Sequence, residues 1–272
     1  SARVLPVSLG RFKMPALILS GLLGILLVIL PIGAIVVTSF IRIFGEPITL
    51  ENLSLEHYGY ILTFKTALEA FWNSFFLGIV AATLALLVAS LIAYYRVKVK
   101  SPLARAADLI ATVPYATPGT VIALALIIAF SGKYGLNLYN TFAILIVAYI
   151  VKYLAFSVRT VCASLEQIDL SLEEAAQISG ARWLESFRDI ILPLVRPGLI
   201  AAWFLVFMTT FYELTMTILL YGPGTHNLGV ILYEMQTYSN QQAASVLAVL
   251  ILVVVLFGNL LVSKITKGKI AI

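Results

Sequence analysis

Apolar runs separated by short polar segments make up most of this chain. Six runs qualify as membrane-crossing helices, which need roughly 20 mostly apolar residues to span the hydrocarbon core of a bilayer. They are residues 15–37, 71–94, 117–130 (with 109–113 before them), 141–157, 197–220 and 243–262. The pattern predicts an all-α integral membrane protein with six transmembrane helices.

The composition agrees with this class. Of 272 residues, 61% are hydrophobic and 11% are charged, whereas about a quarter of the residues of a soluble domain are charged. The first apolar run is too long for a signal peptide and lacks a small-residue cleavage site, so we expect a retained span. Cys162 is the single cysteine and has no nearby His, which favours a packing role over a reactive thiol.

Positive charge gathers on one side of the predicted spans, as it does in cytoplasmic loops. That side holds Arg3, Arg11, Lys13, Arg96, Lys98, Lys100, Arg105, Lys152, Arg159, Arg182, Arg188, Arg196, Lys264, Lys267 and Lys269. The opposite side holds Arg42, Lys65 and Lys133, and residues 221–242 contain no Lys or Arg. We therefore predict that both termini are cytoplasmic and that the net charge of +5 is a topology signal, not a nucleic-acid surface.

The longest polar connection, residues 159–196, carries helix signals of its own. Ser171 and Glu174 have the spacing of a capping box, which predicts that a helix begins there. Gly180 suits a left-handed helix end, because it has no Cβ. A second amphipathic run covers residues 182–191, and we expect Pro193 and Pro197 to end it.

These two helices present apolar side chains on the predicted cytoplasmic side, where neither lipid nor an evident domain covers them. Such a patch indicates a protein partner. The alternative is a surface helix that lies in the headgroup layer. The acidic residues of this connection are interpreted as its solvated face: Glu166, Asp169, Glu173, Glu185 and Asp189.

The same loop carries a recognisable spacing: Glu174-Ala175-Ala176, three residues, Gly180, nine residues, Ile190, one residue, Leu192-Pro193. This resembles the EAA loop of permeases in binding-protein-dependent ABC importers, and the likeness extends over residues 71–262. It implies a type I importer permease fold in the bacterial inner membrane, with residues 159–196 as a helix-turn-helix coupling loop. The first loop helix would then dock into a cleft of a separate ATPase. The implied docking residues are Glu173, Glu174, Ala175, Ala176, Gly180, Ala181, Ile190, Leu192 and Pro193.

Hydrolysis of ATP is not expected in this chain. It contains no G-x-x-x-x-G-K-[ST] phosphate loop, no G-x-S-x-G motif, and no clustered Cys and His ligands. We expect no enzyme activity and no cofactor on the chain itself, with ATP and Mg²⁺ on the partner ATPase. The whole of 1–272 is interpreted as one permease domain, in which 1–70 form the N-terminal span and outer loop.

Five positions are the main candidates for the translocation path: Pro114, Tyr115, Pro118, Tyr212 and Glu213. Pro114, Tyr115 and Pro118 interrupt the third apolar run, and such breaks are tolerated only where protein or water satisfies the freed carbonyls. The segment is either a wall of the path or a packing kink. Glu213, beside Tyr212 within the predicted fifth span, should face inward, in gating or substrate passage or in a structural hydrogen bond.

Weaker candidates lie toward the span ends. Asn73 is more consistent with a cap or packing contact than with the path, and Lys152 is close enough to a span end to snorkel. The outer connection 221–229 has turn residues, and the following 230–235 fit a short re-entrant helix where a substrate-delivering protein would touch. His226 lacks companion ligands and is interpreted as a surface turn residue rather than a metal ligand.

The resemblance extends to a branch of the family. Residues 213–225 and 114–120 look most like permeases of ferric iron importers, then like those for aminoethylphosphonate, and less like polyamine, thiamine and sulfate relatives. In that branch two permease halves are often fused, and residues 3–13 resemble the lead-in to a second half. The implied partners are an ABC ATPase dimer, a second permease subunit or half, an extracytoplasmic binding protein and membrane lipid, but no nucleic acid.

Two other classes fit the hydropathy. A secondary transporter would show inverted repeats and several intramembrane charges, and Glu213 alone is thin support for that. A membrane receptor or scaffold would need neither a broken span nor a coupling loop.

Overall fold

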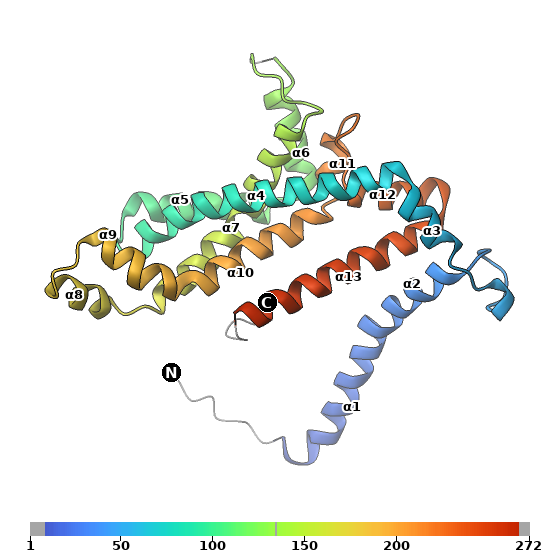
Figure 1. The fold of residues 1–272 in the computed structure, drawn as a ribbon, viewed down its shortest axis with the longest axis horizontal. Coiled ribbons are helices and arrows are strands. Elements are labelled where there is room, and N and C mark those ends of the chain that lie inside the picture. Colours follow the sequence, from blue (N-terminus) through green and yellow to red (C-terminus); the bar gives the residue numbers. More distant parts are fainter. Residues whose placement is uncertain (1–8, 134, 267–272) are drawn as a thin grey trace.

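The computed structural model describes residues 9–133 and 135–266, and these are almost entirely helical (Figure 1). Three of the residues used to predict the topology lie outside the described residues: Arg3, Lys267 and Lys269. The two chain termini, which were predicted to be cytoplasmic, lie outside them as well. The α-helices are α1 (Lys13–Gly24), α2 (Leu30–Phe40), α3 (Glu56–Thr63), α4 (Lys65–Val97), α5 (Pro102–Ala116), α6 (Gly119–Phe130), α7 (Phe142–Glu166), α8 (Leu170–Ile178), α9 (Trp183–Ser186), α10 (Leu192–Phe211), α11 (Thr217–Leu220), α12 (Leu228–Glu234) and α13 (Gln241–Ile265). Shorter 3₁₀ turns occupy Gly10–Phe12 and Leu50–Asn52, and π-helical turns occupy Ile25–Ile29, Phe187–Ile191 and Met235–Ser239.

Five helices in the described residues are long and apolar enough to cross a bilayer. They are Gly10–Phe40, Lys65–Val97, Phe142–Glu166, Trp183–Phe211 and Gln241–Ile265. The expected third span is instead two helices, α5 and α6, which meet at an angle of 109°. The interruption predicted at Pro114 to Pro118 is therefore a break between two helices, because Thr117 is extended and Pro118 has no N–H to continue the helix.

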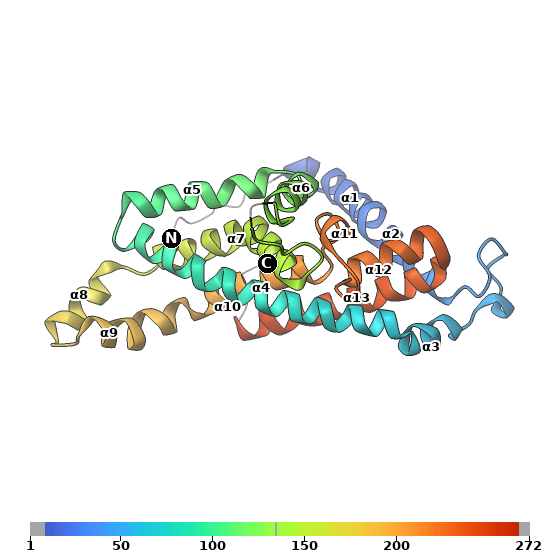
Figure 2. The same cartoon turned by 90° about the horizontal axis from the view of Figure 1, so that it is seen from above.

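Helices α4, α7, α10 and α13 run side by side along the molecule, with α5 against α7 and α4 (Figures 1 and 2). The short helices α8 and α9 lie at one end of this bundle, and α3 and α12 lie at the other. The N-terminal helix diverges from the bundle and contacts α13 through α2. The bundle therefore has one end that carries the loop 159–196 and an opposite end that carries the connections 41–64 and 221–240.

Small residues on α4 allow close helix packing. Small buried residues recur every three or four positions: Ala70, Ser74, Gly78, Ala81, Ala85 and Ala89. In membranes, where lipid is as apolar as a side chain, helices associate through such close contacts. A Cβ at Gly78 would lie 2.8 Å from the Phe207 ring on α10. Helix α4 is thereby the axis against which α7 and α10 pack.

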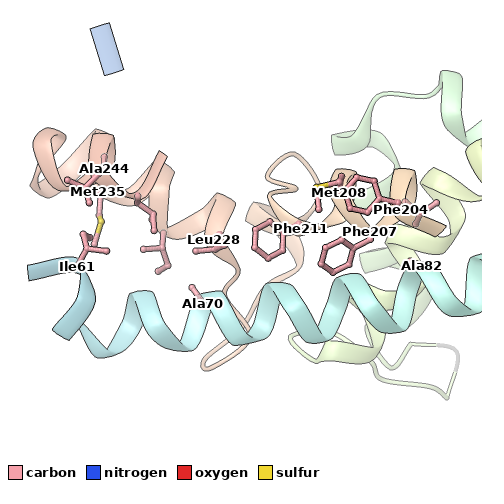
Figure 3. Close-up of a cluster of buried hydrophobic side chains, with 14 of the residues drawn as sticks. Ile61, Ala70, Ala82, Phe204, Phe207, Met208, Phe211, Leu228, Met235 and Ala244 are labelled. Carbon is pink, nitrogen blue, oxygen red and sulfur yellow. The ribbon is translucent and has the colours of Figure 1, made fainter. Parts of the chain in front are cut away.

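An aromatic cluster joins the outer halves of α4 and α10. Phe207 and Phe211 project from α10 toward α4, beside Leu228 of α12 (Figure 3). Phe204 lies instead against Gly258 of α13. The Phe75 and Phe211 rings meet edge to face with centroids 5.0 Å apart, a favourable aromatic arrangement. The cluster fixes the end of α10, where the chain breaks before α11.

Candidate coupling loop and translocation path

Helix α8 begins two residues earlier than the capping box predicted. Asp169 is the N-cap, and its carboxylate accepts a hydrogen bond of 2.9 Å from the Ser171 N–H. Ser171 therefore lies inside the first turn, and the predicted Ser171–Glu174 box was wrong. Hydrogen bonds from the Ser171 backbone and hydroxyl hold the pKa of Asp169 below its ordinary value. A charged carboxylate at this position also complements the positive end of the helix.

The end of α8 follows the prediction for Gly180. Its φ is +90°, in the left-handed region that glycine occupies without a Cβ clash. The Gly180 N–H donates to the Gln177 carbonyl at 2.9 Å, and the Ala181 N–H donates to the Ala176 carbonyl at 3.0 Å. These two bonds form a Schellman motif, which sets the angle between α8 and the chain that follows.

The second loop helix does not stop at the prolines. Residues 183–211 form one continuous helix in which Pro193 opens α10 and Pro197 lies inside it. The prediction that these prolines end the helix was wrong. The π-helical turn Phe187–Ile191 comes directly before them and loosens the hydrogen-bond ladder where prolines donate nothing. One continuous helix thus joins the loop to the membrane-spanning part of α10.

One face of the coupling loop is exposed and apolar. Ile178 is 88% exposed, Leu184 65% and Trp183 53%. Among the predicted docking residues, those open to solvent are Glu174, Ala175, Gly180, Leu192 and Pro193, while Ala176, Ala181 and Ile190 are half-buried. An isolated soluble surface rarely presents such a patch, so it fits a binding face.

The opposite face of α8 is fastened to α4. The Lys98 ammonium lies 2.6 Å from the Glu173 carboxylate, and their side chains are only 5% and 13% exposed. Lys98 also donates to the Ile168 carbonyl at 3.1 Å. Glu173 is therefore not on the solvated face, contrary to that interpretation. No local sequence pattern indicates this pair, because its members belong to different helices.

The break between α5 and α6 is held by Lys152 of α7. Its ammonium donates to the carbonyls of Pro114 (3.4 Å), Tyr115 (3.0 Å) and Thr117. Pro118 cannot donate to the Pro114 carbonyl as a helical residue would, and the cation replaces that donor. The prediction that Lys152 snorkels to the surface was wrong. Tyr115 is 47% exposed, with its ring 5.0 Å from that of Phe156.

Glu213 is buried in a second break rather than in the middle of a span. Helix α10 ends at Phe211 and α11 begins at Thr217, so the predicted span 197–220 is interrupted. The carboxylate accepts from the Thr215 hydroxyl at 2.6 Å, the Met216 N–H at 3.0 Å, and the Thr217 N–H and hydroxyl at 3.0 and 2.7 Å. Its neighbour Tyr212 is 44% exposed. These bonds supply the cap that α11 requires.

A buried polar network surrounds this break, and sequence reasoning missed it. The Tyr149 and Thr217 hydroxyls are 2.6 Å apart, and the Asn227 amide donates to Tyr149 at 3.2 Å and to the Glu213 carbonyl. Asn227 also caps α12 by accepting from the Val230 N–H at 3.0 Å. One sequence signal for part of this network was available: Asn227 stands directly before an apolar helical run, which is typical of a helix N-cap. The network joins α7, α11 and α12.

Asn73 and His226 lie at the outer connection. Asn73 donates to the Gly224 and His226 carbonyls at 3.0 and 2.9 Å, the packing contact favoured by the sequence. His226 is half-buried, 3.9 Å from Glu69, rather than free at the surface. In the described part of the chain no three His, Cys, Asp or Glu residues group as metal ligands. Helix α12 occupies most of the predicted 230–235 segment.

The two breaks adjoin. Gly119, the first residue of α6, lies so close to the second break that a Cβ there would be 3.2 Å from Met216 Cγ.

Residues 75–268 match the sequence model of the binding-protein-dependent transport system inner membrane component. The chain belongs to this family. It is a permease subunit of an ABC importer, a multi-pass inner membrane component that is not itself catalytic.

Relatives with known names are similar over most of this chain. The Fe(3+)-transport system permease protein FbpB 2 of Haemophilus influenzae is 34% identical over 234 residues, 84% of this chain but 45% of that protein. This chain thus spans about half the length of that relative. The spermidine/putrescine permease PotC of Escherichia coli K12 is 29% identical, covering 88% of this chain and 91% of its own length.

Solved structures confirm the permease fold. A bacterial ABC transporter for import of alginate matches with a TM-score of 0.71 at 19% identity, over 94% of this chain and 98% of that one. The MetNI methionine ABC transporter matches with a TM-score of 0.62, over 80% of this chain and 100% of that one. The family match excludes the secondary transporter and scaffold alternatives.

Proposed function

We propose that this chain supplies part of the membrane path of an ATP-driven importer of ferric iron, and that α8 couples the path to a separate ATPase. The observation that carries the coupling role is the two-sided environment of α8. Its inner side is tied to α4 by Lys98 and Glu173, whereas Ile178 on its outer side is almost fully exposed. A helix fixed on one side and bare on the other suits transmission of force from a docked partner.

The proposed docking surface is small and shaped by few side chains. Ala175 and Ala176 permit close approach of a cleft wall, and Glu174 offers an exposed carboxylate to a cationic partner group. Gly180 and its Schellman motif hold α8 at a fixed angle to the continuous helix 183–211. A displacement of α8 would therefore move α10, and with it the break at Glu213.

We place the path at the two adjoining breaks. Lys152 satisfies the carbonyls of the first break and Glu213 caps the second, so non-helical backbone persists inside the membrane at no large cost. Such discontinuous helices line substrate paths in transporters. Pro114, Tyr115, Pro118 and Tyr212 are the remaining proposed path residues, with Asn73 tying the outer connection to α4.

Ferric iron is the proposed substrate because the iron permease relative is 34% identical, against 29% for the polyamine relative. A 2-aminoethylphosphonate permease of Salmonella paratyphi A is 25% identical over 92% of this chain. The two segments that carry the likeness, 114–120 and 213–225, lie against each other around Gly119 and Met216. The proposed partners are an ABC ATPase dimer, a second permease subunit or half, and an extracytoplasmic binding protein.

Reconstituted vesicles test this proposal. The full complex should take up radiolabelled ferric iron in the presence of ATP and its binding protein, with inhibition by vanadate. Spermidine and 2-aminoethylphosphonate serve as parallel substrates. Uptake of either in place of iron would overturn the substrate, and uptake that needs no ATP would overturn the coupling mechanism.

A further inference from the structure

A positively charged pocket lies where α4, α5 and α7 meet near the coupling loop. It has a volume of about 470 Å³, and its charged lining residues are Arg96, Lys100, Arg105, Asp108, Arg159 and Glu166. Four cations face two carboxylates, which leaves a net positive lining. We call these six residues the arginine pocket. The charge distribution predicts that it opens at the cytoplasmic headgroup level.

Asp108 organises the pocket from within. Its side chain is 6% exposed, with Oδ2 2.9 Å from Arg96 Nη1 and Oδ1 3.8 Å from Arg159 Nε. Arg96 also contacts Cys162 Sγ at 3.4 Å, and Arg159 donates to the Thr112 hydroxyl at 3.2 Å. One buried carboxylate on α5 thus positions guanidinium groups from α4 and α7. Each guanidinium has five N–H donors, so donors remain for a ligand.

Lys100 and Arg105 add charge that the described part of the chain does not neutralise. Both are exposed, and neither forms an ion pair with any carboxylate there. Lys100 has a φ of 59°, a left-handed backbone that costs a non-glycine residue about 1–2 kcal/mol. Strain of this kind is concentrated at functional sites. Helix α5 begins at Pro102, between these two cations, and its N-terminus adds positive potential.

We infer that the arginine pocket binds a phosphate group, either in an anionic lipid headgroup or as free phosphate. Guanidinium groups match phosphate oxygens in paired hydrogen bonds, and the lysine adds a mobile point charge. Asp108 Oδ1 is buried and has no hydrogen-bond donor among the described residues, so this carboxylate keeps an unpaired acceptor beneath the two guanidinium groups. Beside the pocket, Leu103 and Ile110 of α5 are 79% and 71% exposed, an apolar surface that suits acyl chains.

The pocket shares the end of α4 with the coupling loop. Arg96 belongs to the last turn of α4, and Lys98, two residues on, holds Glu173 of α8. A phosphate that bridges α4, α5 and α7 at this level holds the end of α4 in place. Because Lys98 at that end binds Glu173, the position of α8 is held with it. This role does not depend on which substrate is transported, so failure of the iron proposal leaves it standing.

Native mass spectrometry of the complex tests the inference. The complex is released from nanodiscs of phosphatidylcholine with and without phosphatidylglycerol, as wild type and as the double variant Lys100→Ala, Arg105→Ala. The matched control removes two cations from the same predicted side outside the pocket, Arg11→Ala with Lys13→Ala. Since each cation near the surface contributes about 1 kcal/mol, the pocket variant should retain phosphatidylglycerol about thirtyfold more weakly, and the control should match wild type.

A second arm identifies the source of the phosphate. Inorganic phosphate is titrated into the complex in phosphatidylcholine alone, and binding is measured by calorimetry. Retained phosphatidylglycerol without phosphate binding identifies a lipid site, and saturable phosphate binding that the pocket variant loses identifies a free-phosphate site. Equal behaviour of the pocket and control variants in both arms overturns the inference.

Discussion

Lys98 and Glu173 form a buried ion pair that joins the end of α4 to the coupling helix α8. We predict that Lys98→Ala or Glu173→Ala uncouples ATPase activity from transport, because each leaves one charge buried and unpaired. Loss of one partner from a buried pair costs about 3–5 kcal/mol. The measurement is the ratio of substrate taken up to ATP hydrolysed by the reconstituted complex.

The matched control for that pair is Lys65 with Glu69, whose side chains are 89% and 46% exposed. Alanine at either control position should leave the ratio unchanged, since exposed pairs contribute little. The exchanged pair Lys98→Glu with Glu173→Lys should recover part of the coupling. Full coupling in both single variants would show that α8 is not anchored by this contact.

Gly180 makes a second prediction. Gly180→Ala should strain the left-handed turn by about 1 kcal/mol, and Gly180→Trp should additionally place a bulky side chain beside the docking face. Both variants should still insert into membranes. The amount of ATPase that copurifies should be highest with wild type, lower with Gly180→Ala and lowest with Gly180→Trp. Gly33→Ala is the control, because that position has open space and no positive φ. Equal ATPase recovery from all variants would contradict the docking geometry.

Lys152 makes a third prediction, at the break between α5 and α6. Lys152→Met keeps the length of the side chain but removes the donor to three carbonyls. Hydrogen bonds that involve a charged group contribute about 1.5–3 kcal/mol each, so thermal unfolding in detergent should begin at a clearly lower temperature. Lys65→Met is the control at an exposed position. An unchanged melting temperature would show that the break needs no cation.

Glu213 makes a fourth prediction, which separates its structural and path roles. Glu213→Gln replaces one acceptor oxygen by an NH₂ group that faces the N–H groups of Met216 and Thr217. Buried donors left without acceptors cost about 1–3 kcal/mol each, so stability and transport should fall together. Glu69→Gln is the control near the bundle surface. Loss of transport at full stability would instead assign the carboxylate a direct role in the path.

The sequence predicted the helical membrane class, the two helices of the loop 159–196 and the Gly180 turn between them, because these depend on local patterns. Periodicity and proline position also located the break at Pro114 to Pro118. The same reasoning failed at Pro193 and Pro197, where a π-helical turn absorbs the missing donors. A proline alone does not show whether the preceding turn can widen.

The rest could not be predicted, because it depends on contacts between distant segments. Lys152 would reach water if α7 stood alone, but the carbonyls of another helix hold it. Glu173 would be solvated if Lys98 were elsewhere. At Ser171 the failure is local: Asp169 is two residues earlier and takes the capping position first. Adjacent capping residues compete, and the outcome depends on where the preceding helix ends.

Accessibility of Ile178 tests the central claim most directly. In a Cys162→Ser background, Ile178→Cys is labelled with a water-soluble maleimide, with the permease alone and with the permease bound to its ATPase. The account predicts rapid labelling of the permease alone, since Ile178 is 88% exposed, and strong protection when the ATPase is bound. Rapid labelling in both states, or slow labelling in both because lipid covers α8, would contradict it.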